Sequence, residues 1–394
     1  MNNRAAVIGM GKSGKAATAL LKSRGYDVTT YDEKDGAFPS PFPAFDFIVL
    51  SPGVPRAKVN ATSPVIGEIE LAWRLLPKGA GPILGITGTN GKSTTTALLG
   101  HMIPQAFVGG NLGRPFSEAC EKVYPVHVVE LSSFQLESIV DTPVLGSIIL
   151  NLTPDHLDRY ASQAEYGAAK ARIFKNAPKN GWVVVNGDDP AVLELSKPAT
   201  VPVHRFSLSQ PFEFTLNNRA LRGDHNRQNA MAAAKCAQLF GLANAQIQAA
   251  LDTFPGLPHR LELVREVNGV EYINDSKATN VDSSLVALAA LKGPIWLIAG
   301  GKGKGAPYEP LVTAARGKVA GVLTIGDDAP VVAKAFGGLF TVHPCETLPR
   351  AIAEAQKLAK PGDTVLLSPA CASYDQFDNF EHRGDTFKRL VNAL

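Results

Sequence analysis

A glycine-rich loop followed by a lysine occupies residues 85–94, GITGTNGKST. Glycines let backbone N–H groups fold inward around phosphate oxygens, Lys92 can reach the β- and γ-phosphates, and a hydroxyl such as that of Ser93 can bind Mg²⁺. The common pattern G-x-x-x-x-G-K-[ST] requires glycine where this chain has Ile86. The stretch is therefore either a nucleotide site of another build or a structural turn. Its candidate nucleotide-contacting residues are Gly88, Thr89, Asn90, Gly91, Lys92, Ser93 and Thr94.

A second glycine motif lies near the N-terminus. Gly9-Met-Gly11-Lys-Ser-Gly14 follows an apolar stretch and Asp32 ends the next one, which matches the dinucleotide fingerprint. The match favours hydride transfer, but a full dinucleotide fold needs two mononucleotide halves, and another glycine loop begins at residue 85. We interpret the motif as a phosphate or nucleotide site at a helix N-terminus. A strand–helix turn that requires small residues is the alternative.

Acidic and imidazole side chains follow two apolar stretches in the middle of the chain. Glu130 ends VHVVE, and NLTPDHLDRY contains Asp155, His156 and Asp158. Because the carboxyl ends of parallel strands meet at one edge of a sheet, we expect Glu130 beside the loop at 85–94, as a metal ligand. The second group could either coordinate metal or cap the next helix, and the alternative for Glu130 is an acid that ends the strand in solvent.

The stretch SQAEYGAAKARIFKNAP predicts a helix with a lysine on its apolar face. Ser162 and Glu165 form a capping-box pattern that sets the first turn near residue 163. At about 100° per residue, Lys170 falls within the apolar arc that includes Tyr166. A lysine there either extends its amine to water or is buried, and a buried lysine must be neutral, paired or modified. We favour a functional lysine.

Short apolar, β-branched runs alternate with helical patterns, which indicates α/β units on parallel sheets. Helices are predicted at 12–24, 163–178 and 226–241. Strands are predicted at 5–10, 27–32, 45–53, 83–87, 126–131, 146–153, 181–188, 270–275, 294–301, 320–327 and 363–370.

Two clusters of glycine and proline mark domain boundaries, PKGAGP at 77–82 and FPGLPHR at 254–260. At about 150 residues per domain, a chain of 394 residues suits two or three domains. We predict three, with bounds 1–82, 83–255 and 256–394.

Composition excludes several classes of protein. The chain is 45% hydrophobic and 19% charged, as in ordinary soluble proteins, and its net charge of +3 gives no case for binding nucleic acid or membranes. The four cysteines are far apart and lack metal-binding spacing, which fits a reducing compartment. There is no signal-peptide pattern and no run of about 18 apolar residues. We expect a cytoplasmic protein and, without a long apolar seam, a monomer.

Nine stretches together resemble one family, the Mur ligases. They are GITGTNGKSTTT, ELSSFQLE, NLTPDHLDRY, AAKARIF, HNRQNAMAAA, PHRLE, NDSKATN, AGGKGKG and SPACASYDQFDNFEHRGDTF. With the first glycine motif they extend from residue 9 to about residue 387, essentially the whole chain. The phosphate loop of this family has the pattern GTxGK[ST], so the resemblance favours a nucleotide loop of another build. The last stretch is similar in particular to the members that add D-glutamate.

The resemblance implies an α/β protein of three domains. These would be an N-terminal Rossmann-like domain for the UDP end of the substrate, a central P-loop-type ATPase domain, and a C-terminal Rossmann-like domain that binds D-glutamate and closes on ATP about FPGLPHR. The implied activity is ATP-dependent addition of D-glutamate to UDP-N-acetylmuramoyl-L-alanine in cytoplasmic peptidoglycan precursor synthesis. It would proceed through an acyl phosphate and a tetrahedral intermediate, releasing ADP and phosphate.

The resemblance also implies roles for residues that match the family's motifs. Lys92 matches the phosphate lysine, Ser93 and Glu130 match ligands of a first Mg²⁺, and His156 matches a ligand of a second. Lys170 matches a carbamylated lysine, in which a neutral amine has added CO₂ and become an anionic oxygen donor. Contacts to ATP are implied for two adenine-binding amides and three C-terminal residues, namely Asn226, Asn229, Arg260, Asp275 and Lys277.

Substrate contacts are implied at both ends of the chain. Those to the UDP-linked substrate are Gly11, Lys12, Ser13, Asp32, Ser51, Gly53 and Asn111. Those to D-glutamate are Thr279, Lys304, Ser373 and Phe380. Two features depart from the family. AGGKGKG carries both Lys302 and Lys304 where relatives often have an acid first, and we choose Lys304; the chain is also short around 195–222.

Three other functions compete with this one. Within ligases, a sister enzyme for another amino acid or a folylpolyglutamate synthase is the rival, although the NFEHRG region argues against both. A nicotinamide-dependent oxidoreductase would rest on GMGKSG and would bind NAD(P). A regulatory ATP-binding module would bind nucleotide without releasing ADP in response to substrates.

Overall fold

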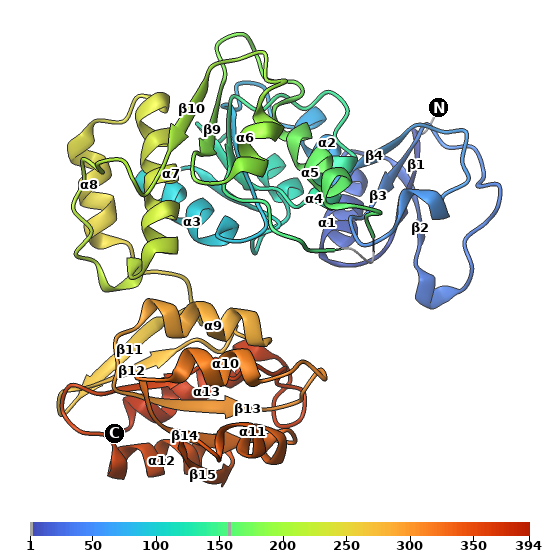
Figure 1. Ribbon diagram of the computed structural model, residues 1–394. Coiled ribbons are helices and arrows are strands. Elements are labelled where there is room, and N and C mark those ends of the chain that lie inside the picture. The colour runs from blue at the N-terminus through green and yellow to red at the C-terminus, as the bar shows by residue number, and fades with distance from the viewer. Residues whose placement is uncertain (1–2, 157–158) are drawn as a thin grey trace. The chain divides into compact units, whose positions relative to one another are not determined.

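The structure is a computed structural model that describes residues 3–156 and 159–394. Its helices surround three separate sheets (Figure 1). The first two sheets are entirely parallel, and the third is parallel except for one edge strand. The predicted α/β fold class is confirmed. Among the described residues, no helix is long and apolar enough to cross a lipid bilayer.

The first sheet has four strands in the order β2-β1-β3-β4. Parallel strands need a crossover between them, and α1 makes the first one, after a turn of small residues. The elements are β1 Arg4–Ile8, α1 Lys12–Ser23, β2 Asp27–Tyr31, η1 Glu33–Asp35, β3 Phe47–Leu50, η2 Arg56–Lys58, β4 Val65–Gly67 and α2 Glu68–Arg74.

The second sheet has six strands in the order β10-β9-β8-β5-β7-β6. Strand β5 lies between β7 and β8, so the carboxyl ends of these three strands meet at one edge. Its elements are β5 Ile83–Thr87, α3 Lys92–Met102, β6 Phe107–Gly110, η3 Phe116–Glu121, β7 His127–Glu130, α4 Ser133–Glu137, β8 Gly146–Ile149, α5 Gln163–Ala171, η4 Arg172–Phe174, β9 Trp182–Asn186, α6 Pro190–Ser196, β10 Val203–Phe206, α7 Asp224–Phe240 and α8 Asn244–Thr253. The short helix η5, Arg219–Leu221, lies between β10 and α7 in the chain but belongs to the same compact unit as the third sheet.

The third sheet has the order β11-β12-β16-β13-β14-β15, with β11 antiparallel to β12. Strands β12, β13 and β16 carry the buried apolar residues expected for a covered parallel sheet. The elements are β11 Glu262–Val267, β12 Val270–Asn274, α9 Val281–Ala290, β13 Ile295–Gly300, α10 Glu309–Ala315, β14 Val319–Ile325, α11 Ala329–Phe336, β15 Thr341–Glu346, α12 Leu348–Leu358, β16 Thr364–Leu367 and α13 Phe380–Asn392.

The helix that carries Lys170 begins as predicted but is capped differently. The Ser162 hydroxyl accepts a hydrogen bond from the Glu165 backbone N–H, which is half of a capping box. The Glu165 carboxylate accepts instead from the N–H of Ala161, one residue before the position that the motif requires. The α-helix ends at Ala171 and is followed by one 3₁₀ turn at Arg172–Phe174, so the helical stretch is shorter than the predicted 163–178.

The contacts divide the chain into two compact units. One comprises residues 1–216 and 225–253, and the other comprises residues 217–224 and 254–394. Within the first unit, one hydrophobic cluster contains residues from both sheets, such as Val7 and Val129. The short segment 217–224 is held in the second unit by Arg222, whose guanidinium donates two 2.8 Å hydrogen bonds to the Glu271 carboxylate. The predicted three-domain division remains a proposal.

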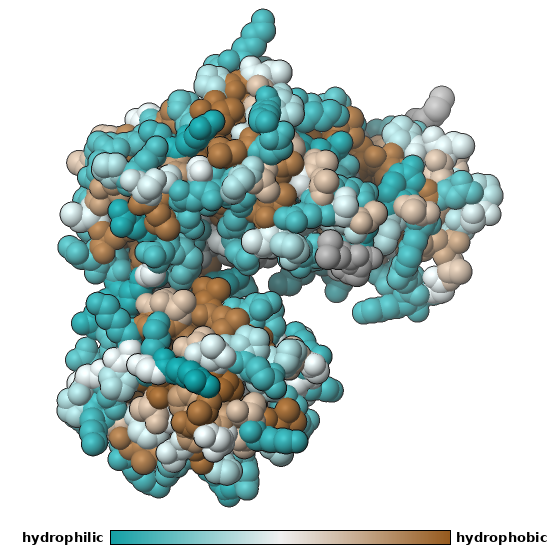
Figure 2. All heavy atoms as spheres, viewed as in Figure 1, coloured by the Kyte–Doolittle hydropathy of each residue, from teal (hydrophilic) through white to brown (hydrophobic). Residues whose placement is uncertain are grey.

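Helix α2 joins the first sheet to the second through two buried glutamates. Glu68 accepts hydrogen bonds from the backbone N–H and the hydroxyl of Ser117. Glu70 accepts from the backbone of residues 140–142 and from Arg74. Buried carboxylates are costly unless they are bonded in this way, so these contacts fix α2 against the second sheet. On the face drawn in Figure 2, polar and apolar residues are interspersed.

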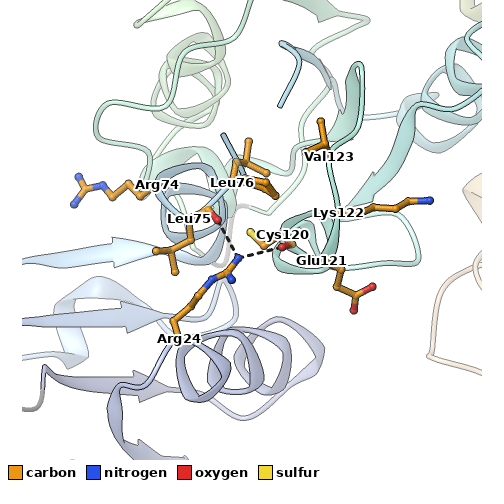
Figure 3. Close-up of a pocket in the computed structure, with 9 residues that line it drawn as sticks. Arg24, Arg74, Leu75, Leu76, Cys120, Glu121, Lys122 and Val123 are labelled. Atoms are coloured by element: carbon orange, nitrogen blue, oxygen red, sulfur yellow. Dashed lines mark hydrogen bonds between the residues drawn. The ribbon is translucent and has the colours of Figure 1, made fainter. Parts of the chain in front are cut away.

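A shallow cavity of about 630 Å³ lies where the ends of α1, α2 and η3 meet (Figure 3). Arg24, which ends α1, points into it and donates to the carbonyl oxygens of Leu75 and Cys120. None of the residues predicted to contact a ligand lines this cavity. We regard Arg24 as a structural clamp between the two sheets.

Candidate active site

The glycine loop between β5 and α3 has the backbone that its glycines permit. Gly88 has a φ of 151° and Gly91 a φ of 83°, a left-handed conformation that disfavours residues with a side chain. A Cβ atom on Gly91 would lie 2.3 Å from Asn229 Oδ1. Ile86 is fully buried within β5, beside β7 and β8. The position that carries glycine in the common pattern is therefore part of the sheet here.

A Gly91→Ala substitution should weaken nucleotide binding by at least about tenfold, because the left-handed φ and the Asn229 contact together displace the loop. Gly79→Ala is the matched control, since Gly79 has a φ of 87° but open space around it. Isothermal titration with ATP would measure both variants. Equal ATP affinities for the two variants would contradict the role of the close contact between Gly91 and Asn229.

Lys92 folds back over its own loop. Its Nζ donates hydrogen bonds of 2.8 and 2.7 Å to the carbonyl oxygens of Gly88 and Thr89. The loop is also tied to the segment after β8, because the N–H of Thr89 donates to the Asn151 carbonyl and that of Asn90 to the Asn151 side chain. A cation at the start of α3, beside the N–H groups of the helix N-terminus, is suited to binding phosphate.

Lys170 points into the same loop from α5. The side chain is fully buried, and its Nζ donates a 2.8 Å hydrogen bond to the Gly88 carbonyl, which also accepts from Lys92. Burial, and then the charge of Lys92, lower the pKa of Lys170 to about 7. A considerable fraction of this lysine is therefore neutral near neutral pH. The alternative of a snorkelling lysine is excluded by its burial.

Glu130 ends β7 at this edge and is almost completely buried. One carboxylate oxygen, Oε1, accepts a 2.7 Å hydrogen bond from Asn111 Nδ2, whereas Oε2 is buried and has no hydrogen-bond partner among the described residues. A buried carboxylate oxygen without a partner is costly, and a bound cation would satisfy it. Glu130 is thus a buried metal-ligand candidate, and the alternative of a solvated acid is excluded.

His156 lies on the loop after β8, with a φ of 55° that is uncommon outside glycine. Its ring centroid is 4.8 Å from that of Phe134 and 5.9 Å from that of Tyr166. The negative charges of Asp155 and Glu130 act against the other two effects on Lys170, because each of them raises its pKa. Asp158, considered with them from the sequence, lies outside the described residues.

The donor set limits how a metal could be held. The described residues contain no group of three or more His, Cys, Asp or Glu side chains suited to a metal ion. A cation bound here would therefore need oxygen atoms from elsewhere, such as the Ser93 hydroxyl, a carbamylated Lys170 or the phosphates of a nucleotide. The unpartnered Glu130 oxygen makes the site compatible with Mg²⁺ in that form.

Two asparagines on α7 lie beside the loop. Asn226 and Asn229 are buried and joined by a 3.2 Å hydrogen bond from Asn229 Nδ2 to Asn226 Oδ1. The space beside Gly91 is limited by Asn229, so α7 reaches the glycine loop. Their amides can donate and accept at once, as recognition of a base edge requires.

The first glycine motif opens into a cavity of about 410 Å³. All seven residues implied for the UDP-linked substrate line it, namely Gly11, Lys12, Ser13, Asp32, Ser51, Gly53 and Asn111. The motif requires glycine at position 14, because a Cβ there would lie 1.9 Å from the carbonyl oxygen of Gly9. The cavity thus brings together residues from the ends of β1, β2, β3 and β6.

Asp32 is engaged differently from a simple ribose contact. Its Oδ2 accepts a 2.6 Å hydrogen bond from the Met10 N–H, and Oδ1 accepts from Lys34. Both bonds lower the pKa of Asp32, and the bond from the Met10 N–H has the larger effect. The carboxylate therefore braces the glycine turn while Asp32 also lines the cavity.

In the second unit, the residues implied for ATP lie around the start of the loop after β12. Asp275 is buried, and its oxygens accept from the Leu261 N–H and the Ser368 hydroxyl. Burial raises the pKa of Asp275 to about 7. Lys277 Nζ lies 5.5 Å from the Phe380 ring centroid, which brings an implied ATP contact beside an implied D-glutamate contact. Arg260 is exposed on the same unit.

A buried arginine that the sequence did not single out lies next to the loop of Ser373, one of the residues implied for D-glutamate. Arg383 is 1% exposed and donates hydrogen bonds to the carbonyl oxygens of Cys371, Ala372 and Ser276 and to the Ser276 hydroxyl. It thereby joins the loop before Lys277 to the loop that carries Ser373. Its place in NFEHRG was the available signal.

Lys302 and Lys304 are both exposed, and Thr279 is half-buried. The backbone of Lys302 forms a two-way bridge with Ala372, next to Ser373. This places the glycine segment around Lys304 near the Ser373 loop, but it does not distinguish the two lysine side chains. The choice of Lys304 remains a prediction.

Comparison with known proteins bears on the whole chain. Residues 86–221 match the family model of the Mur ligase middle domain, and residues 259–371 match that of the Mur ligase glutamate ligase domain. A curated ligase of Myxococcus xanthus is 53% identical over 446 residues, covering 98% of each chain. The chain belongs to the Mur ligase family.

The relatives agree on one name. The Myxococcus protein is a UDP-N-acetylmuramoylalanine–D-glutamate ligase, and so is a protein of Anaeromyxobacter dehalogenans that is 44% identical, with 98% of this chain and 97% of that one covered. Among solved structures, UDP-N-acetylmuramate–alanine ligase of Thermotoga maritima superposes with a TM-score of 0.63 at 19% identity over 99% of each chain. MurF ligase of the same organism, in complex with ADP, gives 0.61 at 16% identity over 100% and 96%. These structures support the Mur ligase fold.

Sequence reasoning missed several residues of this Mur ligase that line the cavity or brace the loops. Met10, Pro52 and Gln135 line the cavity with the predicted residues. Gln135 lies in the quoted ELSSFQLE stretch, and Pro52 lies between two predicted residues. Their neighbours in the sequence were therefore a usable signal.

Proposed function

We propose that this protein joins D-glutamate to UDP-N-acetylmuramoyl-L-alanine at the expense of ATP, releasing ADP and phosphate. The observation that carries the proposal is the position of Asn111, which lines the sugar-nucleotide cavity and donates to Glu130 at the edge that carries the phosphate loop. A substrate seated in that cavity would have its far end next to the loop that holds Lys92. The name shared by the relatives supports this assignment.

The first step activates a carboxylate. An oxygen of the L-alanine carboxylate attacks the γ-phosphorus of ATP, the bond from that phosphorus to the β–γ bridging oxygen breaks, and ADP leaves with the bonding electrons. In this proposal Lys92 and the N-terminus of α3 neutralise charge on the phosphates, which the position of Lys92 at the start of α3 supports. The loop's contribution is placement and charge, because phosphoryl transfer needs little covalent help from the protein.

The second step forms the amide. The neutral amine of D-glutamate attacks the acyl carbon and a tetrahedral intermediate forms. The nitrogen then loses one proton to the departing phosphate as the carbon–oxygen bond to that phosphate breaks. Thr279, Lys304, Ser373 and Phe380 are proposed to hold D-glutamate, with Lys277 and Arg260 supplying positive charge for the phosphates. These residues belong to the second unit.

Two finer features belong to the proposal. Ser93, Glu130, His156 and a carbamylated Lys170 would hold two Mg²⁺ ions, which supply charge neutralisation to the phosphates when bound. We also propose that the protein is cytoplasmic, where its four free cysteines would stay reduced. We further propose a monomer, since the large apolar side chains exposed among the described residues are scattered along the chain.

The deciding experiment is ADP release measured with ATP, UDP-N-acetylmuramoyl-L-alanine and a panel of amino acids. Release should require both the sugar nucleotide and D-glutamate, with L-glutamate, L-lysine and diaminopimelate inactive. Activity with one of the latter would indicate a sister ligase instead. ADP release that does not depend on either substrate would indicate a nucleotide-binding module. Binding of NAD(P) would favour the oxidoreductase alternative.

Substitution of Ser373 by alanine should raise the KM for D-glutamate about tenfold, the equivalent of one lost hydrogen bond, and should leave the KM for ATP within about twofold. Phe380→Leu should act in the same direction. Val331→Ala, at an exposed position of the same unit, is the control and should change neither constant. A larger change in the KM for ATP than for D-glutamate would reject this amino-acid pocket.

A further inference from the structure

Arg159 links two parts of the first unit that the proposed reaction uses separately. Its Nη1 donates a 3.0 Å hydrogen bond to the Pro52 carbonyl, and its Nη2 donates a 2.7 Å hydrogen bond to Glu137 Oε2. The side chain is only 15% exposed. Neither Arg159 nor Glu137 has a role in the reaction as described above, although both lie in quoted motifs.

One end of this link is the sugar-nucleotide cavity. Pro52 lies between Ser51 and Gly53 on the loop after β3, and all three residues line the cavity. A carbonyl in such a loop changes its position when the loop adjusts to a bound molecule. Arg159 is therefore placed to respond to occupation of the cavity from behind its wall.

The other end of the link is the loop of His156. The N–H of Arg159 donates to the His156 carbonyl, and the Arg159 guanidinium carbon lies 4.2 Å from the Phe134 ring centroid. The same Phe134 ring packs against the ring of His156. Tyr160 donates from its hydroxyl to Glu137, which holds the acceptor of the guanidinium in place. These contacts hold the guanidinium between the cavity loop and the Phe134 ring, which in turn packs against the His156 ring.

We propose that Arg159 is a positioning residue that couples occupation of the sugar-nucleotide cavity to the placement of His156 beside the phosphate loop. The inference rests on the proposed function, because it assigns the two coupled ligands as sugar nucleotide and ATP. Binding of the first shifts the Pro52 carbonyl, the rigid guanidinium follows, and Phe134 carries the shift to His156. By linkage, each ligand then tightens binding of the other by the same factor.

The planar guanidinium is essential to this role. Arginine presents several donors in a rigid fork and packs flat against an aromatic ring, so it can hold Pro52, Glu137 and Phe134 in one geometry. Lysine keeps the charge but has a single rotating ammonium, which cannot maintain the same three contacts. Arg159→Lys therefore separates positioning from charge.

The test is the affinity for a non-hydrolysable ATP analogue, titrated with and without saturating UDP-N-acetylmuramoyl-L-alanine. In the unaltered protein the sugar nucleotide should tighten analogue binding at least about fivefold. In Arg159→Lys this ratio should fall to within about twofold of one, while affinity for the analogue alone stays within about twofold. A ratio of one in the unaltered protein, or the same ratio in both proteins, would overturn the proposal.

Arg172 provides a matched control. It too is half-buried and donates to two backbone carbonyls at the end of α4, those of Leu136 and Ile139, but it makes no hydrogen bond to the cavity loop. Arg172→Lys should retain the ratio of the unaltered protein. An equal loss in this variant would assign the effect to packing of α4 and reject the role of Arg159.

Two further measurements make the outcome unambiguous. Glu137→Gln removes the charged acceptor and keeps the Pro52 contact, so its ratio should lie between those of the unaltered protein and Arg159→Lys; an unchanged ratio would count against the proposal even if Arg159→Lys fails to fold. ADP release that depends on D-glutamate is measured on the same unaltered protein. Absence of that release would defeat the proposed function, whereas normal release with unchanged ratios would defeat only the role of Arg159.

Discussion

Replacement of Lys92 by alanine is expected to leave a folded protein whose ADP release is slower by a factor of about 10² to 10³. That is the usual effect of removing one group that stabilises charge in the transition state. Lys92 is the first residue of α3, and its ammonium donates hydrogen bonds to the loop carbonyls of Gly88 and Thr89. Steady-state ADP release, with circular dichroism to verify folding, measures the effect.

Lys15→Ala is the control for this substitution. Lys15 follows Gly14 as Lys92 follows Gly91, but it is exposed on α1 beside the other glycine motif. Its loss should change ADP release by no more than about twofold, as is usual for exposed positions. If Lys92→Ala retained near-normal turnover, the phosphate-binding role of the 88–94 loop would be wrong.

Replacement of Lys170 by alanine is expected to abolish activity, and millimolar acetate or another short carboxylate should restore part of it. The alanine variant leaves a cavity where a carbamylated lysine would have placed an anionic oxygen, and a small carboxylate can supply that oxygen. Addition of CO₂ requires a neutral amine, and the lowered pKa of Lys170, about 7, provides one near neutral pH.

Lys175→Ala, at an exposed position shortly after α5, is the control and should neither lose activity nor respond to acetate. Full activity in Lys170→Ala would remove Lys170 from the site. Loss of activity that no carboxylate relieves would argue for a cationic or packing role instead of carbamylation.

Much of the site could be predicted because its residues follow strongly patterned elements. The lysine of α5 was found from helical periodicity alone, since its neighbours at helical spacing are apolar and buried. Glu130 was found because it interrupts an apolar run at a strand end. The mismatch at Ile86 has a simple cause, as this residue belongs to β5 and the loop begins only after Thr87.

Other features could not be read from local patterns. Strand β4 has only three residues and β15 contains a proline, so neither presents a typical strand pattern. Glu68 and Glu70 look like solvated acids in the sequence, yet they are buried because their partners come from residues 117 and 140–142, far along the chain. Long-range acceptors and donors of this kind leave no periodic signal.

The sequence also did not predict that segment 217–224 belongs to the second unit. Two nearby arginines, Arg219 and Arg222, bind Glu271 on β12, and these ion pairs place the segment in the second unit before the chain returns to α7. For the boundary with the C-terminal part of the chain, the sequence predicted a linker at 254–260, where proline and glycine mark it, and none at 217–224. Charged residues in a short connecting segment gave no comparable mark.

The most direct test of the account is a crystal structure with a non-hydrolysable ATP analogue, Mg²⁺ and UDP-N-acetylmuramoyl-L-alanine. The account predicts the triphosphate at the loop of Gly88–Thr94, the terminal phosphate beside Lys92, and a cation on the free oxygen of Glu130. It also predicts the UDP moiety in the cavity next to Gly11 and Asp32. A triphosphate bound at the first glycine motif, away from Lys92, Glu130 and His156, would contradict it.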